Sequence, residues 1–185
     1  VNFRERFIYK EKICMPDYCF VCDEYSFQIA KKELTPYKNI LICENYFLSH
    51  IIREISAVKS PQAKAVLYVL EDIKEHFDNK LSPWEVAFNN FYENFYKDSD
   101  FEKIIVRPHP KDKPSKYQAL EKYKEVIFDY NISPIESLGK VSTVIGVESY
   151  LLYLAHQCGL NVYTSMPNGV RSPSLPKHCY KFFGN

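Results

Sequence analysis

From residue 64 to residue 163 the sequence alternates between short apolar runs and longer segments of helical character. The apolar runs are rich in Val, Ile and Leu, and they span residues 65–70, 103–106, 126–128, 142–145 and 161–163. Helices are expected between them at 83–96, 114–123, 134–138 and 148–158. Strands that alternate with helices predict right-handed βαβ units. The sequence therefore predicts an α/β fold, a Rossmann-like parallel sheet flanked by helices.

The segment ahead of this alternation is expected to hold strands at 18–22 and 39–43 and helices at 24–34 and 45–58. Ser60-Pro61-Gln62 interrupts the pattern and is the best linker in the chain. Three parts are therefore expected. They are an N-terminal part with its linker (1–61), the α/β domain (62–167) and a tail that wraps the surface (168–185).

Composition excludes several classes of protein. The chain has 185 residues, 46% of them hydrophobic, which suffices for the core of one domain. Its 24 basic and 23 acidic residues give a net charge of +1, so no nucleic-acid partner is expected. No apolar stretch approaches the roughly 20 residues that span a bilayer. Val1 is not an initiator methionine, so we expect a piece of a longer protein.

Six cysteines lie mostly within apolar runs, as buried free thiols do. Cys19 and Cys22 have the spacing of a zinc or redox pair, but they fall inside a predicted strand and lack a second ligand pair. We therefore expect free thiols and a reducing, cytoplasmic compartment.

Arg107-Pro108-His109-Pro110 follows the second predicted strand of the α/β domain. The two prolines fix the backbone on either side of the imidazole. A histidine held at a strand end can donate a hydrogen bond to a phosphate oxygen or act as a general acid. Arg107 and Lys111 add positive charge beside it. The alternative is a proline-rich turn whose histidine merely caps the strand.

Gly146-Val147-Glu148-Ser149 opens the last predicted helix. A helix N-terminus offers unpaired N–H groups and the positive end of its dipole, and a small hydroxyl residue beside it completes an anion site. The alternative is that Glu148 and Ser149 are simply favourable residues for a first helical turn. Because turns after parallel strands share one edge of the sheet, His109 and Ser149 are expected to face the same ligand.

Carboxylates follow two other strands. Glu136 begins a short predicted helix and is suited to accept hydrogen bonds from ribose hydroxyls, or else to complement the helix dipole. Glu71 and Asp72 end the first strand, where one of them could act as a base, although a solvated helix cap is the commoner role. The remaining histidines, at positions 50, 76, 156 and 178, have no partner at metal spacing, so no metal site is expected.

Three of these motifs, in this order and spacing, resemble the carboxyl-terminal domain of bacterial GT-B sialyltransferases, the lipooligosaccharide and multifunctional families. They are the His-Pro pair at 109–110, the Pro-x-Glu-x-Leu turn at 134–138 and the Gly-Val-x-Ser-x-Leu helix start at 146–151. The resemblance covers about Lys64 to Pro167. The chain departs from the family by having Ser149-Tyr150 where many members have Ser-Ser. The chain also lacks most of an acceptor-binding half.

The resemblance implies roles for individual residues. His109 would contact the phosphate of CMP and protonate it as it leaves, Glu136 would bind the nucleoside and Ser149 the phosphate. The resulting assignments are His109 and Asp72 as catalytic residues, and Arg107, His109, Lys111, Glu136, Gly146 and Ser149 as nucleotide-binding residues.

The implied enzyme is a metal-independent, cofactor-free glycosyltransferase with a CMP-sugar donor and a glycan acceptor. It would transfer sialic acid or a related nonulosonic sugar in lipooligosaccharide or capsule polysaccharide synthesis. It would be cytoplasmic at the inner membrane face, with peripheral membrane association and a homodimer as further expectations. In this reading residues 1–61 are a remnant of the N-terminal domain, and residues 62–167 bind the nucleotide sugar. Two alternatives stay open: another GT-B transferase that uses CMP-Kdo or CDP-glycerol, and a non-catalytic remnant that binds a nucleotide or a partner.

Overall fold

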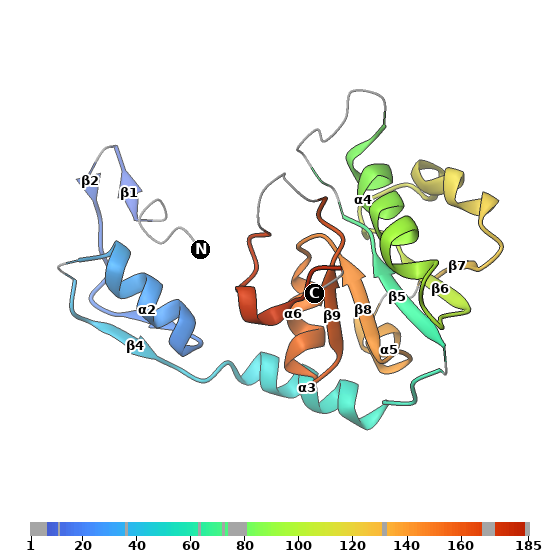
Figure 1. Cartoon of the computed structure of the whole chain (residues 1–185). Coiled ribbons are helices and arrows are strands. Elements are labelled where there is room, and N and C mark those ends of the chain that lie inside the picture. Colours follow the sequence, from blue (N-terminus) through green and yellow to red (C-terminus); the bar gives the residue numbers. More distant parts are fainter. Residues whose placement is uncertain are drawn as a thin grey trace. The chain divides into compact units, whose positions relative to one another are not determined.

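The computed structural model describes residues 7–10, 12–35, 37–62, 64–71, 73, 81–130, 133–167 and 173–183. The chain divides into two compact units, Val1–Ser49 and His50–Asn185, and each is described by itself (Figure 1). Within the described ranges, none of the helices has the length and apolar character needed to cross a membrane.

Unit 1 contains a short hairpin and one βαβ unit. The hairpin pairs β1 (Ile8–Tyr9) with β2 (Lys12–Ile13), two strands that the sequence did not predict because two residues give no readable alternation. The βαβ unit joins β3 (Cys19–Val21), α2 (Glu24–Glu33) and β4 (Ile40–Ile42), with the strands parallel. Cys19 is buried in the small core of this unit, as predicted, but Cys14, Cys22 and Cys43 are exposed, so the expectation of mostly buried thiols is wrong for unit 1.

Unit 2 holds the predicted alternation of strands and helices. After α3 (Tyr46–Ala57), which begins in unit 1, its elements are β5 (Ala65–Val69), α4 (Pro83–Phe91), the π-turn η1 (Tyr92–Tyr96), β6 (Lys103–Arg107), the 3₁₀ helix η2 (Pro114–Lys122), β7 (Val126–Phe128), α5 (Pro134–Gly139), β8 (Thr143–Gly146), α6 (Tyr150–Gln157), β9 (Asn161–Thr164) and the 3₁₀ turn η3 (Lys177–Cys179).

The five strands of unit 2 form one parallel sheet in the order β7-β6-β5-β8-β9 (Figure 1). The predicted α/β fold with a parallel sheet flanked by helices is therefore confirmed. Numbered along the unit, the strand order is 3-2-1-4-5, which is the order of the first five strands of the six-stranded Rossmann sheet. The tail continues beside β9, where Lys181 forms a parallel bridge with Tyr163.

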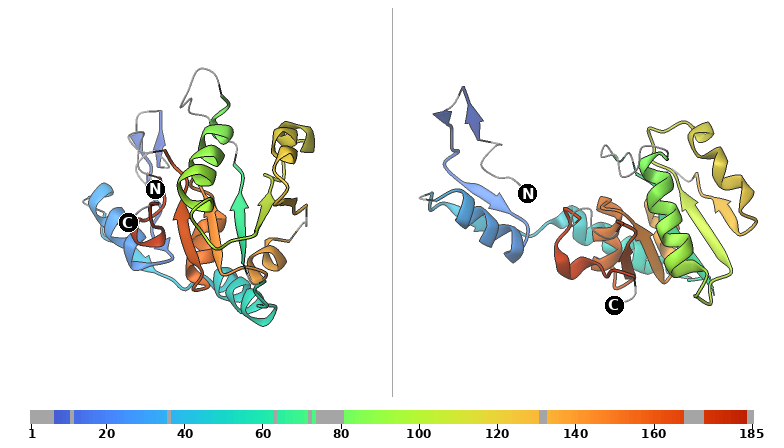
Figure 2. Two further views of the ribbon diagram at one scale, coloured as in Figure 1. Left: turned by 45° about the vertical axis from the view of Figure 1, so that its right-hand side comes forward. Right: turned by 45° about the horizontal axis from the view of Figure 1, so that its top comes forward.

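Each face of the sheet carries its own helices (Figure 2). On one face, α4 and η2 pack on the alternate residues Val66 and Tyr68 of β5. The other face carries α5 and α6. The first face is largely aromatic: the Tyr68 ring lies 5.0 Å from Phe88, and Trp84 lies 5.1 Å from Tyr117, measured between ring centroids. Much of the chain's aromatic content therefore serves the core.

Two predicted helices have a different local geometry. The helix expected at 83–96 is α-helical only to Phe91 and ends in the π-turn η1. The helix expected at 114–123 is the 3₁₀ helix η2. The buried residues of η2, Tyr117 and Leu120, are three positions apart. A 3₁₀ helix has three residues per turn, so both side chains reach the sheet from the same side of η2.

Candidate functional site

The candidate site lies at the carboxyl edge of the sheet in unit 2. Glu71 follows β5, His109 follows β6 and Ser149 follows β8, each within three residues of the strand end. Because these strands are neighbours and parallel, all three turns leave the same edge (Figure 1). Adjacent strands are about 4.8 Å apart, so the axes of β6 and β8 are separated by about 10 Å. His109 and Ser149 therefore share one edge, as the sequence predicted.

This edge includes the topological switch point of the sheet. The chain moves from β5 outward through β6 to β7, and then returns to the other side of β5 through β8 and β9. In open α/β sheets, ligands bind beside the strands where the direction reverses. Here that place lies between the carboxyl ends of β5 and β8.

His109 is held by its own turn. Its carbonyl oxygen accepts a hydrogen bond from the Asp112 N–H at 2.9 Å, and its Nδ1 accepts one from the Lys111 N–H at 3.3 Å. A ring nitrogen that accepts a hydrogen bond carries no proton in the neutral imidazole, so the ring proton lies on Nε2. Nε2 is therefore the atom that can donate to a ligand. The side chain of Lys111, in the same turn, is exposed.

Asp112 provides a charged neighbour for His109. Its carboxylate accepts hydrogen bonds from the Tyr117 hydroxyl and from Lys116 Nζ, the latter at 3.0 Å. Burial alone would raise the pKa of Asp112, but these two hydrogen bonds, helped by the charges of Lys116 and His109, lower it overall. The turn after β6 therefore holds an ionised carboxylate next to His109.

Arg107 faces the interior of unit 2. Its side chain is 6% exposed, and its Nη1 donates to Ser137 Oγ at 2.8 Å and lies 3.7 Å from Asp129 Oδ2. The Ser137 hydroxyl in turn donates to Asp129. The guanidinium that the sequence assigned to the nucleotide therefore joins the end of β6 to α5 and to the residue that follows β7.

The start of α6 is already occupied by a carboxylate. Glu71 Oε1 accepts hydrogen bonds from the backbone N–H groups of Val147 and Glu148, both at 2.9 Å. The Ser149 side chain caps the helix by accepting from the Leu151 N–H at 3.3 Å. Burial raises the pKa of Glu71 above its ordinary value, although the backbone N–H groups of residues 147–149 oppose part of that rise. The anion that these N–H groups hold is thus a side chain of the protein.

Gly146 makes the contact of Glu71 with the start of α6 feasible. A Cβ atom at Gly146 would lie 3.0 Å from the Val69 carbonyl oxygen and 3.3 Å from Glu71 Oε1. Both distances are tighter than ordinary van der Waals contact, so a side chain would push β8 away from β5 or displace the carboxylate. The sequence assigned Gly146 to nucleotide binding, and the structure places it at this close approach.

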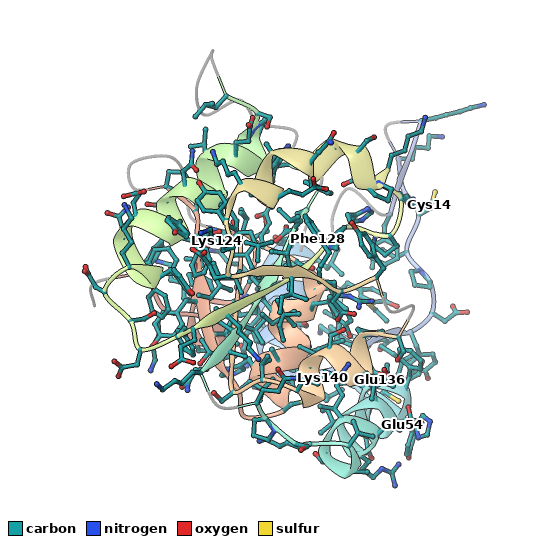
Figure 3. All side chains as sticks on the ribbon, turned by 90° about the vertical axis from the view of Figure 1, so that its right-hand side faces the viewer. Cys14, Glu54, Lys124, Phe128, Glu136 and Lys140 are labelled. Carbon is teal, nitrogen blue, oxygen red and sulfur yellow. The ribbon has the colours of Figure 1, made fainter. Side chains whose placement is uncertain are left out.

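The tail also reaches this edge. The Ser174 N–H donates to Glu148 Oε2 at 2.9 Å, next to the N–H groups that hold Glu71. Glu136 lies on the outside of α5, where its side chain is 60% exposed and its carboxylate lies 4.0 Å from Lys140 Nζ (Figure 3). Asp72, predicted as a catalytic carboxylate, lies outside the described residues, as does His76.

Two groups of residues escaped the sequence prediction. Asp98-Ser99-Asp100 has the Asp-x-Asp pattern of a metal motif, but it precedes β6 and so lies at the opposite edge of the sheet, with both carboxylates exposed.

The second group is formed by His156, His178 and Cys179, which come together although about twenty residues separate the first from the other two. Pattern spacing could not reveal this group because the fold of the tail brings it together. Burial lowers the pKa of His156, and the charge of His178 lowers it further.

Comparison with known proteins gives a distant likeness in fold. No protein-family model matches the chain, and no curated protein matches it. A structure of the wall teichoic acid polymerase TagF is 15% identical, with 80% of this chain and 38% of the polymerase chain covered and a TM-score of 0.43. A variant of the same polymerase, with a histidine replaced by alanine, is 14% identical over 90% and 46% of the two chains, with a TM-score of 0.46. The chain spans less than half the length of these structures. This likeness assigns no donor and no binding residue to the chain.

Proposed function

We propose that unit 2 binds the phosphate of a nucleotide-activated donor and is the donor-binding half of a GT-B-type transferase. The observation that carries this proposal is the orientation of His109. Its Nδ1 is engaged by the Lys111 N–H, so its Nε2–H is left for a ligand at the carboxyl edge. A phosphate there would receive a hydrogen bond from Nε2 and positive charge from the Lys111 ammonium.

The chemistry of group transfer suits these groups. When the donor is cleaved, the bond between the transferred group and a phosphate oxygen of the nucleotide breaks. Negative charge then collects on the leaving nucleotide. A hydrogen bond from His109 Nε2–H to that oxygen stabilises the leaving group. Transfer would also need an acceptor-binding half, so we propose donor binding for unit 2 and transfer for a protein that includes both halves.

Two donor classes are compatible with this site. CMP-sialic acid presents one phosphate and CDP-glycerol presents two, and either would place an anionic oxygen at His109. The matched structures are of a wall teichoic acid polymerase, and none is described as a sialyltransferase. We therefore propose a cytidine nucleotide donor and treat the choice between a CMP-sugar and CDP-glycerol as an arm of the experiment. The exposed Glu136 carboxylate is the group proposed for the ribose hydroxyls.

The competing function is a non-catalytic module that keeps the fold. Glu71 occupies two N–H groups at the start of α6, and the Ser174 N–H binds Glu148 next to them. A protein that no longer binds a phosphate at this helix would have these contacts permanently. In the transferase, Glu71 instead fixes the turn between β8 and α6, and the phosphate binds on the β6 side, at His109.

Isothermal titration calorimetry of the chain with CMP, CDP-glycerol, UMP and ADP tests the proposal. We expect a cytidine nucleotide to bind most tightly. His109→Ala should weaken that binding about ten- to 150-fold, since a hydrogen bond to a charged group contributes about 1.5–3 kcal/mol. His50→Ala is the matched control, because His50 is an exposed histidine on α3 in unit 2. Equal binding of all four nucleotides, or no loss with His109→Ala, would reject the donor site in favour of the non-catalytic module.

A further inference from the structure

We infer that His156, His178 and Cys179 form a binding site for a zinc ion that fastens the tail to α6. His156 lies in the last turn of α6, and His178 and Cys179 lie in η3. The ligand atoms that the three residues offer all lie within 4.8 Å of one another. This site is separate from the proposed donor site because it lies at the other end of α6 from Ser149.

The donor atoms select the class of metal. Two imidazoles and one thiol are ligands for Zn²⁺ and other borderline or soft transition-metal ions, whereas Mg²⁺ and Ca²⁺ require oxygen ligands. Three protein ligands leave one tetrahedral position, which a water molecule would fill. His178 is exposed, so that position is accessible to solvent, while Cys179 is 1% exposed and anchors the site in the interior.

The three ligand atoms are already close to the separations of a tetrahedral zinc site. With Zn–N bonds of about 2.1 Å and a Zn–S bond of about 2.3 Å, two ligand atoms of a tetrahedral site are about 3.4–3.6 Å apart. No two of the ligand atoms here are more than 4.8 Å apart, so an approach of at most about 1 Å brings them to that spacing. The imidazole rings of His156 and His178 meet at 64° with their centroids 5.6 Å apart, so they are not stacked and a side-chain rotation can bring their nitrogens together.

The backbone around the site is already fixed on both sides. The Cys179 N–H donates to the Pro176 carbonyl oxygen at 2.9 Å, which closes the turn of η3. Two residues later, Lys181 pairs with β9, since its N–H donates to the Val162 carbonyl oxygen at 2.9 Å. Because α6 and β9 are consecutive elements of the sheet unit, the ligands sit on a supported framework. A bound ion would add a third attachment for the tail.

The test is a titration of the whole chain with Co²⁺ and then Zn²⁺. Cys14, Cys22 and Cys43 are exposed thiols in unit 1 and would compete for metal, so all three are first replaced by serine. In this background we expect one equivalent of Co²⁺ with thiolate-to-metal charge-transfer absorption and the visible bands of a four-coordinate ion. Zn²⁺ should displace the Co²⁺ and remove both signals.

Three single variants in that background separate the outcomes. His178→Asn, at an exposed side chain, and Cys179→Ser should each weaken Zn²⁺ binding at least tenfold, and Cys179→Ser should abolish the charge-transfer band. Cys158→Ser is the matched control, because Cys158 lies two residues after His156 and outside the group. If Cys179→Ser does not fold, His178→Asn still decides the question. Tight binding that survives His178→Asn, or a charge-transfer band that disappears with Cys158→Ser, would overturn the site.

Discussion

At the scale of single residues, two members of the Arg-Pro-His-Pro motif differ in where their side chains lie. Arg107 and His109 are two positions apart, yet the guanidinium lies inside unit 2 and the imidazole lies in the turn at the sheet edge. Strand alternation does not explain the difference, because residues two positions apart point to the same face and β6 ends at Arg107. Arg107 stays inside because Asp129 and Ser137 complete its hydrogen bonds, and both come from elsewhere in the sequence.

This buried network predicts a large loss of stability for Asp129→Asn. The substitution removes the carboxylate that faces the Arg107 guanidinium, and breaking a buried ion pair costs about 3–5 kcal/mol. Urea unfolding followed by circular dichroism measures the difference. Glu136→Gln is the control, since its partner Lys140 is 4.0 Å away and exposed, and an exposed pair contributes about 0–1 kcal/mol. Similar losses in both variants would show that Arg107 does not depend on its buried partner.

The carboxylate of Glu71 predicts a pH dependence of stability. Burial raises its pKa in the folded chain, so the folded state binds this proton more tightly than the unfolded state does. The resulting stabilisation is present below the unfolded-state pKa and is lost as the pH rises through the folded-state pKa. Glu71→Gln keeps an oxygen acceptor for the N–H groups of residues 147 and 148 but does not titrate. We expect the unfolding free energy of the wild type to fall more than that of Glu71→Gln from acid to neutral pH; parallel curves would contradict this.

At the scale of elements, α6 shows which boundary signals are reliable. The sequence predicted a helix ended by Gly159, and Gly159 has φ +70°, the left-handed conformation that closes a helix. The N-terminal boundary was predicted two residues early. Glu148 precedes the helix, because its N–H binds Glu71 and the cap is Ser149. A contact from β5, distant in sequence, therefore determines where α6 begins.

Gly159→Ala tests the C-terminal boundary. Among the described residues, no atom beyond the chain neighbours of Gly159 lies within 4 Å of the position that a Cβ would take, so the substitution acts through backbone strain. The left-handed conformation costs a residue with a Cβ roughly 1–2 kcal/mol. Thermal unfolding should show this loss for alanine and a smaller one for asparagine, which tolerates positive φ better. An alanine variant as stable as the wild type would mean that the helix does not end in this conformation.

At the scale of the whole molecule, local pattern predicted the sheet and only part of the site. Each strand of unit 2 was readable because it is a short buried apolar run beside a helix, and parallel pairing follows from that alternation. The shared edge of His109 and Ser149 follows in the same way. The inward direction of Arg107, the contact of Glu71 with α6 and the group around Cys179 depend on residues 22 to 77 positions apart. Such long-range contacts leave no signal in local sequence.

The most direct test of the proposed donor site is to follow the His109 imidazole while a cytidine nucleotide binds. Nitrogen-15 long-range spectra resolve Nδ1 and Nε2 of each histidine, and the His109 signals are identified by their loss in His109→Ala. We predict that CMP or CDP-glycerol shifts His109 Nε2, while the signals of His50 stay in place. Saturating nucleotide that leaves His109 Nε2 unchanged, or that shifts His50 equally, would contradict a phosphate site at the carboxyl edge of unit 2.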